Sequence, residues 1–185
     1  MSQRQTCGVA IDAGDEMRRI WSGPALDEQG CLVRIGFEAD EPAEVVKTAR
    51  EALSAVLRRL ESWPDDAEWP GLLPPAFVSR CAPEPPEPER EIGAEAIAAW
   101  ERRWRALPIE EKIALTEGPW TLSDWLYYFD PADDGRGHDR HWWWWDAGTD
   151  ETGNRWIEVT TTGWPFETGS LYWLIEASSG HRAHY

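Results

Sequence analysis

The segment 138–148, HDRHWWWWDAG, gathers the side chains of this chain that are most capable of chemistry. Four consecutive tryptophans follow two histidines and precede an aspartate. Successive side chains of a β-strand point to opposite faces, so we expect Trp142 and Trp144 on one face and Trp143 and Trp145 on the other. Packing can cover one pair, and the other pair then either packs against a further layer or forms an aromatic binding platform.

The residues around the tryptophans restrict what a platform could bind. Nearby aspartates favour a cationic group, which is attracted both to the indole faces and to the carboxylates. Sugar rings are the neutral alternative, with the carboxylates then available for glycoside hydrolysis. The competing interpretation is that all four tryptophans serve core packing. The candidate binding residues are Trp142, Trp143, Trp144, Trp145, Trp164, Asp130, Asp139 and Asp146.

Metal binding and nucleophilic catalysis find little support in the sequence. His138 and His141 lie near aspartates in a polar loop and are weak metal candidates, because their spacing matches no helical ligand pair and no calcium loop. The chain has no G-x-S-x-G, no phosphate-binding loop and no G-x-G-x-x-G after a strand. We therefore predict no cofactor, no metal and no catalytic residue.

The charge of the chain restricts its partners. The 34 acidic residues outnumber the 18 basic ones, for a net charge of −16, and the excess is shared by both halves. Such a field repels nucleic-acid phosphates and anionic membrane surfaces and attracts basic proteins. The basic residues are almost all arginine, which is typical of a GC-rich bacterial genome. The oligomeric state is left open.

Targeting signals and cysteine pairing indicate a compartment. The sequence has no stretch of 18 apolar residues and no signal-peptide pattern at its start. Its three cysteines, Cys7, Cys31 and Cys81, include no C-x-x-C pair. We expect reduced, mostly buried thiols in a cytoplasmic protein.

The N-terminal part, residues 1–62, is predicted to be a β-hairpin followed by a long helix. Residues 17–21 and 31–39 are the expected strands, on either side of a turn-rich connection, and 7–14 is a weaker third strand. Apolar residues recur at 3.6 spacing from Pro42 to about Glu61, which predicts an amphipathic helix. Residues 63–92, rich in Pro and Glu, are predicted to be a linker.

The C-terminal part, residues 93–185, is predicted to be a Trp-rich helical and β-hairpin module. Helices are expected over 93–107, over 108–115 and after Thr121, where Thr121 and Asp124 form a capping-box variant. The tryptophan run and 155–163 are expected to pair as a hairpin. A helix over 170–180 closes the module, and the last five residues are expected to be frayed. The predicted class is α+β.

These observations favour a non-enzymatic function. We expect an acidic interaction protein that binds a basic protein partner, as an inhibitor or immunity protein does. The alternative is an enzyme or small-ligand binder with a Trp-lined acidic pocket around residues 130–150, taking a cationic or carbohydrate ligand.

Overall fold

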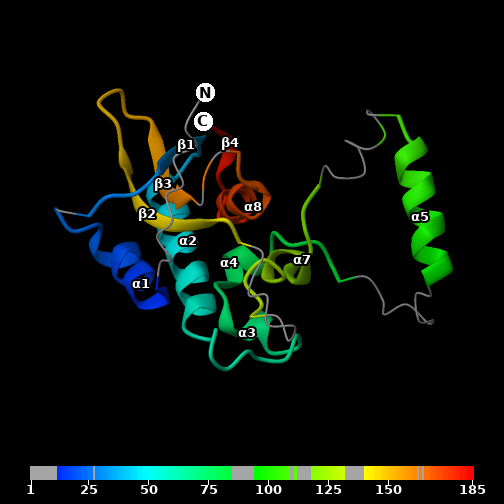
Figure 1. Cartoon of the computed structure of the whole chain (residues 1–185). Coiled ribbons are helices and arrows are strands. Elements are labelled where there is room, and N and C mark those ends of the chain that lie inside the picture. Colours follow the sequence, from blue (N-terminus) through cyan, green and yellow to red (C-terminus); the bar gives the residue numbers. More distant parts are fainter. Residues whose placement is uncertain are drawn as a thin grey trace, which may run out of the picture.

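A four-stranded antiparallel sheet organises the protein, shown as a computed structural model in Figure 1. The structure describes residues 12–26, 28–84, 94–108, 111, 118–131, 140–161, 163 and 165–185. The strands run in the order β2-β3-β1-β4. Their bounds are β1 Leu32–Glu38, β2 Trp142–Thr149, β3 Arg155–Thr161 and β4 His181–His184. Because β1 lies between β3 and β4, the sheet joins segments from both sides of the predicted linker.

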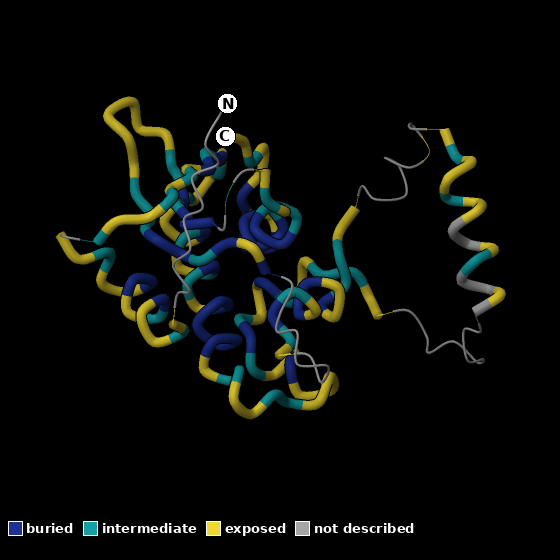
Figure 2. The backbone as a smooth tube through the Cα atoms, viewed as in Figure 1, coloured by how far each residue is buried: buried dark blue, intermediate teal, exposed yellow. Residues whose placement is uncertain are grey.

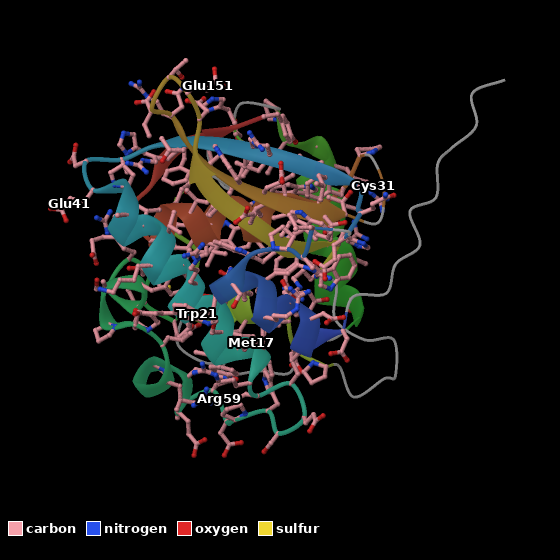
Figure 3. The ribbon with its side chains drawn as sticks, turned by 90° about the vertical axis from the view of Figure 1, so that its left-hand side faces the viewer. Met17, Trp21, Cys31, Glu41, Arg59 and Glu151 are labelled. Atoms are coloured by element: carbon pink, nitrogen blue, oxygen red, sulfur yellow. The ribbon has the colours of Figure 1, made fainter. Side chains whose placement is uncertain are left out.

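The helices α1, α2 and α8 lie on one side of the sheet (Figures 1 and 3). The α-helices in the described ranges are α1 Ala13–Ser22, α2 Pro42–Leu57, α3 Trp69–Leu72, α4 Pro75–Val78, α5 Ala94–Ala106, α7 Leu122–Leu126 and α8 Gly169–Ala177. Figure 1 shows α5 standing apart from the sheet and the other helices. The protein is therefore a mixed α+β protein, as predicted.

The core lies between the sheet and these helices, where Figure 2 shows buried backbone along α2, α8 and β2. Alternate residues of the strands face it, because a strand turns every second side chain to the same face. Aromatic rings fill much of this space, among them Trp69, Phe77, Trp125 and Phe129, all almost fully buried. Phe77 and Phe129 each pack on Trp125, with ring centroids 4.7 and 4.8 Å from the centroid of its indole.

Ser170 at the start of α8 holds two of the buried indoles. The Nε1–H of Trp142 donates to the Ser170 hydroxyl at 2.9 Å, and that of Trp125 donates to the Ser170 carbonyl at 3.1 Å. A buried indole N–H needs such a partner to offset the loss of water. This one residue therefore fixes α7 and β2 against α8.

Several predicted elements are confirmed. The helix predicted from Pro42 is α2, which ends at Leu57 rather than near Glu61. Its N-cap is Glu41, whose side chain makes no capping hydrogen bond. The hairpin of the tryptophan run is β2–β3. The helix 93–107 is α5 and the closing helix is α8. The capping box is complete, because the Thr121 hydroxyl accepts the Asp124 N–H and the Asp124 carboxylate accepts the Thr121 N–H, each at 3.1 Å.

The predicted N-terminal β-hairpin is wrong. Residues 17–21 lie in α1 rather than in a strand, and β1 pairs with β3 and β4 instead. The Asp12 side chain caps α1 by accepting the Gly14 N–H at 2.7 Å, and Gly23 ends it at a φ of 72°, a backbone conformation that favours glycine. The short apolar pattern of residues 17–21 wrongly suggested a strand. The helix-capping residues Asp12 and Gly23, in contrast, are signals that can be recognised in the sequence.

The expected fraying of the last five residues is also wrong. His181–His184 form β4, which pairs with β1 at the edge of the sheet. The partner strand, β1, lies far away in the sequence, so no local pattern predicts this pairing.

The first half of the predicted linker is packed rather than extended, since Trp69, Leu73 and Phe77 belong to the core. Residues 85–93 and most of the helix predicted over 108–115 lie outside the described residues.

The expectation of three reduced cysteines needs correction. Cys31 is disulfide-bonded, whereas Cys81 is a free thiol. Cys7, the remaining cysteine, lies outside the described residues. At least one cysteine of this chain is therefore structural, and the cysteine content no longer indicates a reducing compartment.

Candidate functional site

The tryptophan run lies on β2, an edge strand, and most of it belongs to the core. Trp142 and Trp144 share the helix-covered face, as strand alternation predicts, and both are 0% exposed. The pairing of β2 with β3 shifts register between Trp144 and Asp146, so Trp145 is the extra residue of a β-bulge. The bulge leaves Trp145 buried against α1, where the Arg19 guanidinium lies 4.8 Å from its ring centroid. Trp143 is half-buried.

A buried ion pair between Glu16 of α1 and Arg140, two residues before β2, lies beside the tryptophans. Both guanidinium NH₂ groups of Arg140 donate to the Glu16 carboxylate, at 2.9 and 2.7 Å, and Glu16 also accepts the Trp144 backbone N–H at 2.7 Å. Three rings surround the Arg140 guanidinium, with centroids 5.0 to 5.8 Å from its Cζ atom: Phe129, Trp142 and Trp143. An edge strand leaves backbone donors unpaired, and here a carboxylate of α1 satisfies one of them.

This cluster is structural rather than a ligand site. The Arg140 side chain is 2% exposed and that of Glu16 is 0% exposed, and their charges already neutralise each other. Sequence reasoning missed both residues, which are 124 positions apart. The sequence suggested an aromatic platform for an external cation, and in the structure Trp142 and Trp143 instead face the protein's own Arg140.

The structure describes only some of the other predicted site residues. Asp130 and Asp146 are half-buried, and His141 is exposed. Asp139, Trp164 and the second metal candidate, His138, lie outside the described residues. Within the described ranges, no group of three or more His, Cys, Asp or Glu side chains could hold a metal ion.

A different feature has the form of a binding site, namely a pocket of about 430 Å³ between the 66–84 segment and α7. Its volume lies within the range of about 300–1,000 Å³ that is usual for ligand pockets. Apolar side chains make up most of the lining. The described lining residues are Asp66, Ala67, Pro70, Val78, Cys81, Ala82, Pro83, Glu84, Leu122, Ser123 and Leu126.

Two hydrogen bonds join the two walls of the pocket. The Ala82 N–H donates to the Trp120 carbonyl at 2.8 Å, and Ala82 and Thr121 form a parallel β-bridge. The Ser123 N–H donates to Oε1 of Glu84 at 2.9 Å, and the capping box fixes the first turn of α7. These bonds preorganise the pocket, because the 82–84 wall cannot move away from α7 without breaking both of them.

The charged residues in the described lining of the pocket are all acidic. Asp66 and Glu84 are exposed, which places their carboxylates at the rim, while Leu122 and Leu126 are buried at 7% and 5% exposure. Among the described lining residues, none is Lys, Arg or His. The Glu84 carboxylate accepts the Ser123 N–H at Oε1, and its remaining lone pairs are free to face a cation.

The Cys81 thiol in the pocket wall is held in its neutral form. Burial raises the pKa of the Cys81 thiol to about 11, and the charge of Glu84 adds a smaller contribution in the same direction. A thiol alkylates only as its thiolate. Cys81 is therefore an inert wall residue rather than a nucleophile.

We expect Cys81 in the folded protein to alkylate slowly with iodoacetamide at pH 8, where only about one thiol in a thousand is ionised, against about one in four of ordinary thiols. The rate should rise about tenfold between pH 8 and pH 9. Peptide mass spectrometry measures the modified fraction over time, with glutathione as the reference thiol. A rate equal to that of glutathione at pH 8 would contradict the burial of the thiol.

Comparison with family models, with curated proteins and with solved structures found no match to this chain. In the described parts of the chain, no helix combines the length and the apolar character needed to cross a membrane. A function for the protein must therefore be inferred from the pocket and from the charge around it.

Proposed function

We propose that this chain is an acidic interaction protein that binds a basic protein partner, in the manner of an inhibitor or immunity protein. The observation that carries the proposal is the preformed pocket with an apolar floor, two carboxylates at its rim and no cation among its described lining residues. A net charge of −16 would draw a basic partner towards such a site over a long range.

The proposal moves the binding site away from the tryptophan run. Trp142, Trp144 and Trp145 are part of the core, so they are not available as a flat platform or as the wall of a pocket around residues 130–150. Nothing among the described residues favours the alternative of an enzyme or carbohydrate binder. Nucleic acid and anionic membranes stay excluded on charge, as expected from the sequence.

A cytoplasmic location stays a prediction. The disulfide at Cys31 counts against it, because disulfides are rare in cytosolic proteins and persist in oxidising compartments. Binding of a basic partner does not depend on which compartment is correct.

The proposal predicts site-specific, salt-sensitive binding of a cationic probe. The probe is a synthetic 12-residue peptide of alternating Arg and Gly, titrated into the protein by calorimetry at 50 and 300 mM NaCl. We expect affinity to fall about tenfold or more at the higher salt, since screening weakens exposed charge pairs. The double variant Asp66→Asn, Glu84→Gln should lose affinity, and Gln at position 84 can still accept the Ser123 N–H.

The matched control removes the same charge elsewhere. Glu41 and Glu151 are exposed, and Figure 3 labels both, with Glu151 at the tip of the β2–β3 hairpin. The variant Glu41→Gln, Glu151→Gln should bind the peptide almost as the wild type does. Equal losses in the two double variants, or binding that is insensitive to salt, would overturn the pocket as the site of a basic partner.

A further inference from the structure

The arrangement of polarity in the pocket bears on which side chain of a partner enters it. The most buried lining residues, Leu122 and Leu126, are apolar. The exposed lining residues include the apolar Ala67 and Pro70 as well as the two carboxylates, Asp66 and Glu84. The charged groups of the described lining therefore lie at the rim, while its buried part is apolar.

A lysine or arginine that entered this pocket head first would be poorly matched. Its backbone would stay at the mouth and its charge would reach the apolar floor, where a desolvated cation without a partner is costly. The acidic rim would face the uncharged stem of the side chain. An apolar side chain gains free energy on the same floor by removing its surface from water.

We propose that the pocket receives one large apolar side chain of the partner, and that Arg or Lys residues flanking it in the partner's sequence pair with Asp66 and Glu84. This inference rests on the proposed function and specifies the recognition element. The arrangement is that of an interface hot spot, in which a buried anchor is surrounded by contacts that exclude water. Charge complementarity selects a basic segment over other apolar ones.

The walls suit such an anchor because they are fixed before binding. The Ala82–Trp120 and Ser123–Glu84 hydrogen bonds join the two sides of the pocket, at 2.8 and 2.9 Å. A rigid pocket avoids the entropy cost of ordering loops when the partner binds. The bond from Ser123 also holds the Glu84 carboxylate at the mouth, beside the place where a flanking cation would lie.

Three peptides separate the two parts of the inference. The first has Phe between two Arg-Gly pairs on each side, the second replaces Phe by Ala, and the third keeps Phe but replaces every Arg by Gln. Calorimetry with the full chain measures each affinity. We expect the first peptide to bind about tenfold tighter than the second, and the third to bind much more weakly than the first.

A mutation that fills the pocket localises the anchor. Ala67 is an exposed lining residue, so Ala67→Trp should remove the preference for Phe over Ala. Ala43, exposed at the start of α2 and outside the lining, provides the matched control as Ala43→Trp, which should keep the preference. Methyl NMR signals of Leu122 and Leu126 should shift with the first peptide.

The outcomes distinguish the inference from the function on which it rests. If the Phe and Ala peptides bind wild type equally, the apolar anchor is overturned and binding of a basic partner survives. If the Gln peptide binds as tightly as the first, the requirement for basic residues is overturned. If the Phe preference persists in Ala67→Trp, the pocket is not where the anchor lies.

Discussion

Replacing Glu16 by Gln should lower the free energy of unfolding by about 3–5 kcal/mol, because it leaves the Arg140 guanidinium buried without its counter-charge. Glu16 makes two hydrogen bonds to Arg140 and one to the backbone of Trp144, and neither charged side chain is appreciably exposed. The loss would also weaken the attachment of α1 to the edge of the sheet. Urea denaturation followed by tryptophan fluorescence measures the change.

Two further variants make this prediction specific. Glu38→Gln removes one carboxylate from an exposed pair, since Glu38 and Arg182 are 53% and 76% exposed, and should cost about 0–1 kcal/mol. The double variant Glu16→Gln, Arg140→Met removes both charges and should recover a large part of the loss. If the Glu16 and Glu38 variants lose equal stability, the buried ion pair does not anchor α1.

Truncating Trp144 to Ala should cost about 3–5 kcal/mol, because it removes a fully buried indole and leaves a cavity. Trp144 packs on the helix-covered face of β2, and the Arg50 guanidinium lies 5.8 Å from its ring centroid. The same truncation at the half-buried Trp143 should cost clearly less. Thermal or urea unfolding of the two variants provides the comparison.

This result also affects how binding data on the tryptophan run are interpreted. A loss of partner binding in Trp144→Ala would report loss of the fold, whereas a loss in Asp66→Asn, Glu84→Gln would report loss of the site. An equally stable Trp144→Ala variant would instead show that the tryptophan contributes little to the core, and would reopen the run as a binding surface.

The candidate site could not be read from the sequence. The sequence suggested a tryptophan platform among aspartates around residues 130–150, whereas no described lining residue of the pocket is a tryptophan. The pocket is formed by a stretch that composition marks as a linker and by the short helix α7, which Glu84 and Ser123 join although they are 39 residues apart. Proline-rich composition predicts little regular structure, but it does not exclude packing.

Local interactions are the part of this protein that its sequence determined by itself. The amphipathic period of α2, the Thr121–Asp124 capping box and the pairing of β2 with β3 all depend on residues that are close along the chain. Their energies come from contacts at short sequence spacing, so they can be recognised without knowing the fold.

Tertiary structure decided everything that depends on distant partners. Residues 17–21 carry a pattern that also suits a short strand. In the structure they lie in the helix α1, whose Glu16 is buried against Arg140, 124 positions away. β4 exists because β1 lies beside it, and the bulge at Trp145 removes that side chain from the face that alternation assigned to it. A buried charge, an edge strand and a pocket each depend on contact with a second segment of the chain. Only the tertiary structure determines which segment makes that contact.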